Sequence, residues 1–124
     1  DLLGDASQTV VAAPWRHDGH PDHDAAGRAA AVAAAASGAR LLEYPLLAWG
    51  QLEPDELPWS DVSCLTLTPD VREQKARAIR SHVSQVRAAE PGRGAPLPQR
   101  VLAHFHTPYE HYVETPPEAV EDSL

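Results

Sequence analysis

The sequence predicts an α/β fold in which parallel strands alternate with helices. Three observations carry this prediction: an apolar stretch at residues 9–13, an alanine-rich run at residues 25–36 and a second apolar stretch at residues 40–44. A strand, a helix and a strand in this order form the unit from which parallel sheets are built. In such sheets, ligands bind at the carboxyl ends of the strands, opposite a helix N-terminus.

The alanine-rich run has clear helix boundaries. Pro21 suits the first helical position, where a missing N–H costs nothing, and this makes His20 the N-cap. Gly38 suits the left-handed position after the last turn, so the helix should end near Ser37. Its small side chains favour close packing on the sheet, most closely at Gly27, and we interpret the run as a packing surface.

The remainder of the chain predicts three strands, two further helices and two loops. The strands are expected at residues 40–44, 62–68 and 109–113 (the last as a strand or an extended cover), the helices at 69–86 and 98–105, and the loops at 51–60 and 90–98. Thr68 and Pro69 are typical of a helix start. One face of the longer helix predicts a buried stripe made of Val71, Lys75, Ile79, His82 and Val86. For His82 we expect a hydrogen-bonded structural role.

Composition bounds the class of protein. A chain of 124 residues with 43% hydrophobic residues suits one small domain or a piece of a larger one, and a net charge of −8 argues against a nucleic-acid partner. No stretch approaches the roughly 18 apolar residues of a membrane span. Residues 114–124 carry four acids and no bases, so we expect a domain at 1–113 and a solvated tail at 114–124.

The single cysteine, Cys64, excludes an internal disulfide framework and favours a reducing, cytoplasmic location. We expect it to be a small buried hydrophobic residue in its strand.

The turn before the alanine-rich helix concentrates the reactive groups. Three imidazoles and three carboxylates lie within the eight residues 17–24, which suggests metal chemistry. The partial positive charge of a helix N-terminus keeps histidine neutral and able to donate a lone pair to a metal. Asp22 and Asp24 offset that charge, and such carboxylates can accept the other ring N–H. The alternative is that His20 is only an N-cap and His23 only a solvated residue.

The sequence GHPDHDAAG at residues 19–27 resembles the second signature of the PIG-L/LmbE-like deacetylases. These zinc-dependent enzymes remove an acetyl group from N-acetylglucosamine-type amines. Further segments, one before this motif and the others after it, resemble the family in the same order, and the resemblance covers about residues 9–113. They are residues 14–16, Glu43-Tyr44-Pro45 with Trp49, the helix holding Lys75 and His82, and Phe105 with Tyr109-Glu110. The resemblance implies part of a Rossmann-like three-layer sandwich with a mostly parallel sheet.

The first signature of that family, an Ala-His-Pro-Asp-Asp-Glu-like segment, is not in the sequence. In the family it supplies two metal ligands and the catalytic base. We therefore interpret residues 1–113 as the C-terminal portion of such a deacetylase domain, inactive by itself. A catalytic zinc site needs about three protein ligands and an open position, of which this chain offers only a part.

The resemblance also implies roles for individual residues. His23 matches a ligand of zinc (or another divalent metal), His20 the histidine that stabilises the oxyanion, and Asp22 the carboxylate that orients and tunes that histidine. The implied partner is a small N-acetylated amino-sugar substrate. Arg16 and Asp18 precede the motif and are candidates to contact polar groups of the substrate, although Arg16 can instead pair with Asp18 or Asp24.

Several alternatives remain open at this point. The chain can be a non-catalytic metal-binding or interaction fragment of the same fold. A flavodoxin-like or Rossmann-like binding domain without metal is disfavoured because no Gly-x-Gly-x-x-Gly segment is present. Tyr44, Trp49 and the loop at 51–60 form either a wall for a sugar ring or part of the core. The spacing of His104, His106 and His111 suggests a second metal site, but the surrounding loop shows no sign of a second shell.

Overall fold

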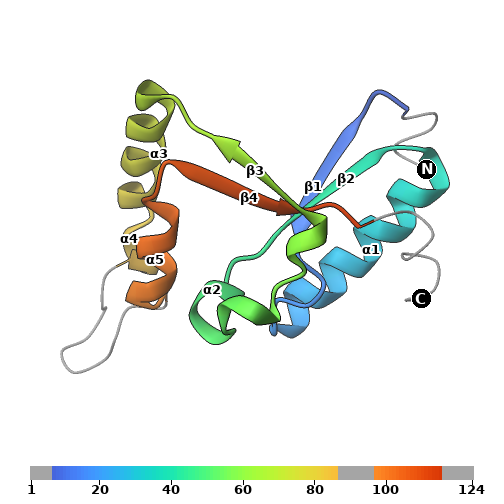
Figure 1. Ribbon diagram of the computed structural model, residues 1–124, viewed down its shortest axis with the longest axis horizontal. Coiled ribbons are helices and arrows are strands. Elements are labelled where there is room, and N and C mark those ends of the chain that lie inside the picture. Colours follow the sequence, from blue (N-terminus) through green and yellow to red (C-terminus); the bar gives the residue numbers. More distant parts are fainter. Residues whose placement is uncertain (1–6, 87–96, 116–124) are drawn as a thin grey trace.

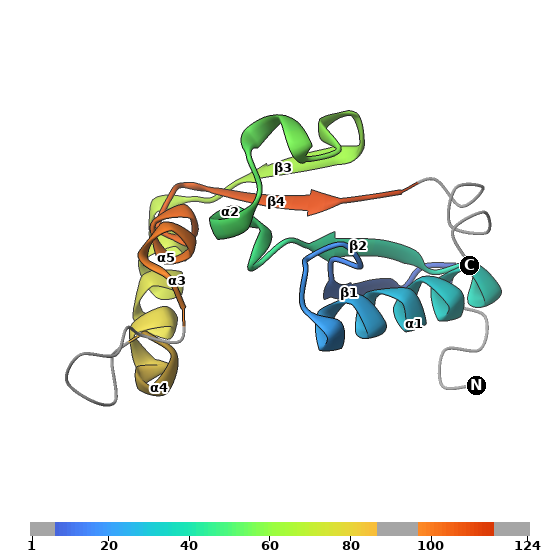
Figure 2. The same ribbon diagram turned by 90° about the horizontal axis from the view of Figure 1, so that it is seen from below.

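The computed structural model describes residues 7–86 and 97–115 and has the predicted α/β class. Its elements are β1 (Val10–Pro14), α1 (Pro21–Ser37), β2 (Arg40–Tyr44), α2 (Ala48–Gln51), two 3-10 turns (Pro54–Glu56 and Trp59–Asp61), β3 (Val62–Thr66), α3 (Pro69–Ser81), α4 (Val83–Val86), α5 (Gln99–Phe105) and β4 (Tyr109–Val113). Helix α1 covers one face of β1 and β2, whereas α3 and α5 lie side by side at the far end of the β3–β4 ribbon (Figures 1 and 2).

The first half of the fold follows the local signals. His20 is the N-cap of α1, Pro21 its first residue, and Gly38 closes it in the left-handed conformation with φ of 81°. Strands β1 and β2 pair in parallel, with Val10 opposite Arg40 and Pro14 opposite Tyr44. The carboxyl end of β1 therefore leads directly into the turn that precedes α1, as predicted.

Helix α1 lies unusually close to the sheet at Gly27. A Cβ atom built on Gly27 would be 2.6 Å from the carbonyl oxygen of Pro14 and 2.7 Å from the nitrogen of Arg16. Ala31 and Ala34 are also buried on this face. The predicted packing role of the small residues is confirmed.

The sheet is mixed rather than mostly parallel, which corrects one part of the predicted fold. The strand order is β1-β2-β4-β3, and β4 is antiparallel to both of its neighbours. Helices α3 and α5 bring the chain back to the end of β3, where Leu67 donates to the carbonyl of Pro108 at 2.8 Å. A strand that starts where its neighbour ended must run in the opposite direction.

The core is small and lies between the end of β1 and the segment 48–62. Trp15, Ala48, Leu57 and Val113 form its buried cluster. Trp49, Leu52 and Val62 pack against this cluster while remaining partly buried. The core therefore includes Trp15, the first residue after β1, and packs against the start of the turn.

Two burial predictions in the second half are wrong. Cys64 is exposed because, among the described elements, β3 packs extensively only against β4, and residues 63–66 are all exposed. Helix α3 buries no residue, Val71 on the expected stripe is 46% exposed, and His82 is an exposed residue that ends α3 rather than a buried one within it. The long helix therefore breaks into α3 and α4.

In the parts of the chain that the structure describes, no helix has the length and apolar character to cross a membrane. Most of the predicted tail lies outside the described residues. Glu114 is described, and its carboxylate pairs with the guanidinium of Arg40 at 2.8 Å.

Candidate active site

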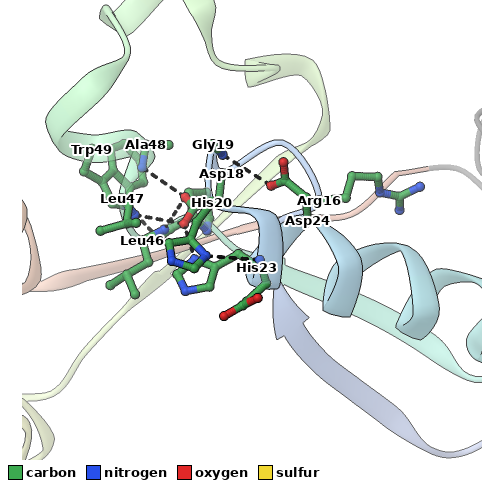
Figure 3. Close-up of polar contacts among 12 residues, drawn as sticks. Arg16, Asp18, Gly19, His20, His23, Asp24, Leu46, Leu47, Ala48 and Trp49 are labelled. Atoms are coloured by element: carbon green, nitrogen blue, oxygen red, sulfur yellow. Dashed lines mark hydrogen bonds and ion pairs between the residues drawn. The ribbon is translucent and has the colours of Figure 1, made fainter.

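The turn between β1 and α1 places His20 and His23 on one turn of the helix, as the sequence predicts. The Nδ1 atom of His20 accepts a hydrogen bond from the backbone N–H of Asp22 at 3.1 Å. The Nδ1 atom of His23 lies 2.6 Å from Oδ2 of Asp18. The two rings stack with their centroids 4.7 Å apart and their planes at 29° (Figure 3).

The hydrogen-bond partners give the two imidazoles opposite tautomers. Because a carboxylate only accepts, the Nδ1 of His23 carries a proton, and in the neutral ring Nε2 then has the free lone pair. Because the Nδ1 of His20 accepts an N–H, the proton of that neutral ring is on Nε2. The site thus presents one nitrogen able to bind a metal and one N–H able to donate to an anion.

The carboxylate of Asp18 links His23 to the backbone of residues 46–48. Its Oδ1 accepts from the backbone N–H groups of Leu46 at 2.8 Å and Ala48 at 3.0 Å, and its Oδ2 accepts from that of Leu47 at 3.0 Å. Figure 3 shows the carboxylate between His23 and this backbone segment. The residue is 1% exposed. No local pattern predicts this arrangement, because the three donors follow Asp18 by 28 to 30 residues.

Arg16 also points inward. Its Nη2 lies 2.8 Å from Oε2 of Glu43, and its Nε and backbone N–H donate to Oε1 at 3.0 and 3.1 Å. The two side chains are 4% and 0% exposed. Within the described residues the ion pair forms with Glu43, in place of the expected pairing with Asp18 or Asp24. The predicted substrate contacts of Arg16 and Asp18 stay predictions, and both side chains already have partners inside the protein.

Asp22 and Asp24 occupy the first turn of α1. It is the backbone N–H of Asp22 that bonds to His20. The predicted tuning of His20 by the Asp22 carboxylate stays a prediction. Asp24 accepts from the backbone N–H of Gly19 at 3.3 Å, which closes the turn.

The residues of the turn fit one ligand of a zinc site. Within residues 7–86 and 97–115, no group of three or more His, Cys, Asp or Glu side chains is arranged to hold a metal ion. A catalytic zinc site takes about three protein ligands. The described part of the chain therefore offers His23 and lacks the rest of the set.

The second metal site considered for the C-terminal histidines does not form in the described structure. The ring of His104 instead stacks on Trp49, with centroids 3.6 Å apart and planes at 15°. His111 lies 5.3 Å from His104 and 5.5 Å from Trp49, measured between ring centroids. Burial, with the nearby charges of His111 and Lys75, lowers the pKa of His104 to about 4.

Of the aromatic residues after β2, one packs against the core and another is exposed, and the wall for a sugar ring stays a prediction. Trp49 is partly buried against the core, and its indole N–H donates to the carbonyl of Pro45 at 2.8 Å. Trp59 is 46% exposed and lies 6.4 Å from Trp49. Neither Trp49 nor Trp59 lines the depression of about 570 Å³ beside the turn, which is lined by Leu57 of the loop at 51–60 and by Trp15, Arg16, His17 and Val113 among others.

Fold and site together define a mixed α/β chain with a histidine pair at the carboxyl end of a parallel strand. A curated protein similar to this chain is the 1D-myo-inositol 2-acetamido-2-deoxy-alpha-D-glucopyranoside deacetylase of Actinosynnema mirum. The two are 35% identical over 132 aligned positions, which cover 86% of this chain and 47% of the relative. This chain therefore spans about half the length of that relative. No protein-family model and no solved structure matches the chain.

Proposed function

We propose that this chain contributes the His-Pro-Asp-His part of a zinc-dependent deacetylase of the PIG-L/LmbE-like family. Its substrate would be an acetamide of the N-acetylglucosamine type. The observation that carries the proposal is the difference in partners at Nδ1: a backbone N–H donor for His20 and a carboxylate acceptor for His23. The similarity to a deacetylase whose name describes an acetamido sugar supports the same reaction.

His23 would hold the zinc ion through Nε2. When bound, such an ion polarises a carbonyl and lowers the pKa of its water towards neutrality. The N–H on Nε2 of His20 would donate to the oxygen that gains negative charge as the acetamide is attacked. The positive end of α1 would support the same charge, since both histidines lie at its N-terminus. The remaining ligands and the general base would come from outside the described residues.

The second candidate is a non-catalytic metal-binding or interaction fragment of the same fold. The lack of a three-ligand group within the described residues favours it for this chain by itself.

Zinc titration calorimetry and deacetylation of an N-acetylglucosaminyl substrate test the proposal. Both are measured on the 124-residue chain and on a version extended upstream with sequence from the same gene. We expect the extended protein to bind one zinc ion tightly and to release acetate, and the short chain to bind weakly. His23→Ala should abolish both properties in the extended protein.

His17→Ala is the matched control, because His17 is an exposed imidazole in the same turn. It should leave zinc binding and acetate release close to the wild-type values. Zinc binding without acetate release by the extended protein would favour the non-catalytic candidate. No zinc binding by either version would end the deacetylase proposal.

A further inference from the structure

The carboxylate of Asp18 is the junction of three segments. It follows β1, accepts three backbone N–H groups at residues 46–48, and contacts Nδ1 of His23 on α1. The contact with His23 is the shortest of the four, at 2.6 Å. The side chain is 0% exposed, so solvent does not compete for either oxygen.

The contact with Asp18 determines which tautomer the neutral His23 ring adopts. Asp18 cannot donate a proton as a carboxylate, so a neutral imidazole facing it must carry its proton on Nδ1. The opposite tautomer would put two lone pairs 2.6 Å apart in a buried place. The three backbone donors keep the carboxylate fixed, because moving it would leave those N–H groups unsatisfied.

We propose that Asp18 is a positioning residue that holds His23 in the tautomer presenting Nε2 to a metal ion. A carboxylate in this role orients the ring and raises the basicity of the ligating nitrogen. The same carboxylate fixes the segment that leads into Trp49, so the orientation of His23 and the start of α2 depend on one group. The metal part of this inference rests on the proposed function, whereas the tautomer does not.

The tautomer of His23 is measured first, in the metal-free 124-residue protein, by long-range ¹H–¹⁵N NMR. We expect the wild-type ring to carry its proton on Nδ1. A proton on Nε2 in the wild-type protein would overturn the proposal without any variant. This measurement needs no zinc and no substrate.

Asp18→Asn then tests whether the carboxylate is responsible. The amide retains one acceptor oxygen, but its NH₂ group would face N–H donors, so His23 should lose its single tautomer. In zinc titrations of the upstream-extended protein, we expect affinity to fall by about 10–100-fold. Asp24→Asn is the matched control, because Asp24 lies in the same turn and accepts only a 3.3 Å bond from Gly19 among the described contacts.

Thermal unfolding separates this role from a purely structural one. A variant with a lower Tm but an unchanged His23 tautomer and zinc affinity would show that Asp18 only supports the fold, and would overturn the proposal. If Asp18→Asn does not fold, the wild-type tautomer still decides. A wild-type ring protonated on Nδ1 in a protein that binds no zinc would support the positioning by Asp18 and end the deacetylase proposal instead.

Discussion

His20 and His23 occupy the same turn of α1 but differ in which ring nitrogen is free. The difference separates two roles that the spacing alone cannot assign, because either histidine of a His-x-x-His pair can bind metal. A lone pair on Nε2 of His23 suits a ligand, and an N–H on Nε2 of His20 suits an oxyanion donor. The family resemblance predicts this division of roles, and the hydrogen-bond partners of the two rings are compatible with it.

In the upstream-extended protein, His20→Ala should therefore reduce the turnover of the acetamide substrate much more than it reduces the zinc content. Removing one oxyanion donor typically lowers kcat by on the order of a hundredfold or more. Zinc content by metal analysis should stay close to that of the wild-type protein. His20→Asn is the companion variant, because an asparagine oxygen can still accept the N–H of Asp22 and cap the helix. Loss of zinc from His20→Ala as complete as from His23→Ala would contradict the assignment.

At the scale of the element, the position of α1 determines where both histidines lie. Its N-cap, its first proline and its C-terminal glycine are local signals, and for this reason the sequence predicts the helix boundaries well. Its distance from the sheet depends on Gly27, which sits against the backbone of Pro14 and Arg16. The turn with the candidate site begins at that same backbone.

Gly27→Ala should destabilise the protein despite the better helix propensity of alanine. The propensity gain is at most about 1 kcal/mol, whereas forcing an extra methyl group into a packed contact costs about 1–3 kcal/mol. The added Cβ would lie 2.6–2.8 Å from backbone atoms that cannot rotate away, so the helix must move. Thermal unfolding should show a lower Tm.

Ala26→Ser is the control for that experiment, because it adds one atom at an exposed neighbouring position of α1. Its Tm should remain near the wild-type value. An unchanged or raised Tm for Gly27→Ala would mean that α1 lies farther from the strand than the structure places it.

At the scale of the whole molecule, the sequence predicts what depends on neighbours in the chain. The strand–helix–strand unit, the caps of α1 and α3 and the final strand are all confirmed. The direction of β4 depends on where α5 returns the chain, and the exposure of Cys64 depends on how little of the described chain packs on β3. The bonds of Asp18 to residues 46–48 join segments far apart in the sequence, so no local pattern predicts them.

We expect the cluster of Trp49, His104 and His111, in which the first two rings stack, to make the stability of the fold depend on pH. It joins α2, α5 and β4, and burial together with the charge of Lys75 lowers the pKa of both histidines, that of His104 to about 4. Glu110 offsets the charge of Lys75 through an ion pair at 3.0 Å. Among the described residues, Nδ1 of His111 is buried without a hydrogen-bond partner.

We therefore expect the protein to lose stability as the pH falls from about 6.5, the ordinary pKa of histidine, towards 4. In this window the unfolded chain binds more protons than the folded one, so acidification favours unfolding. Tm measured between pH 7.5 and 5 should fall by several degrees, in a range above the titration of most carboxylates. His104→Phe keeps a ring against Trp49 but cannot bind a proton, so its Tm should change less over the same range. A pH profile of Tm as steep in His104→Phe as in the wild-type protein would show that other groups cause the loss.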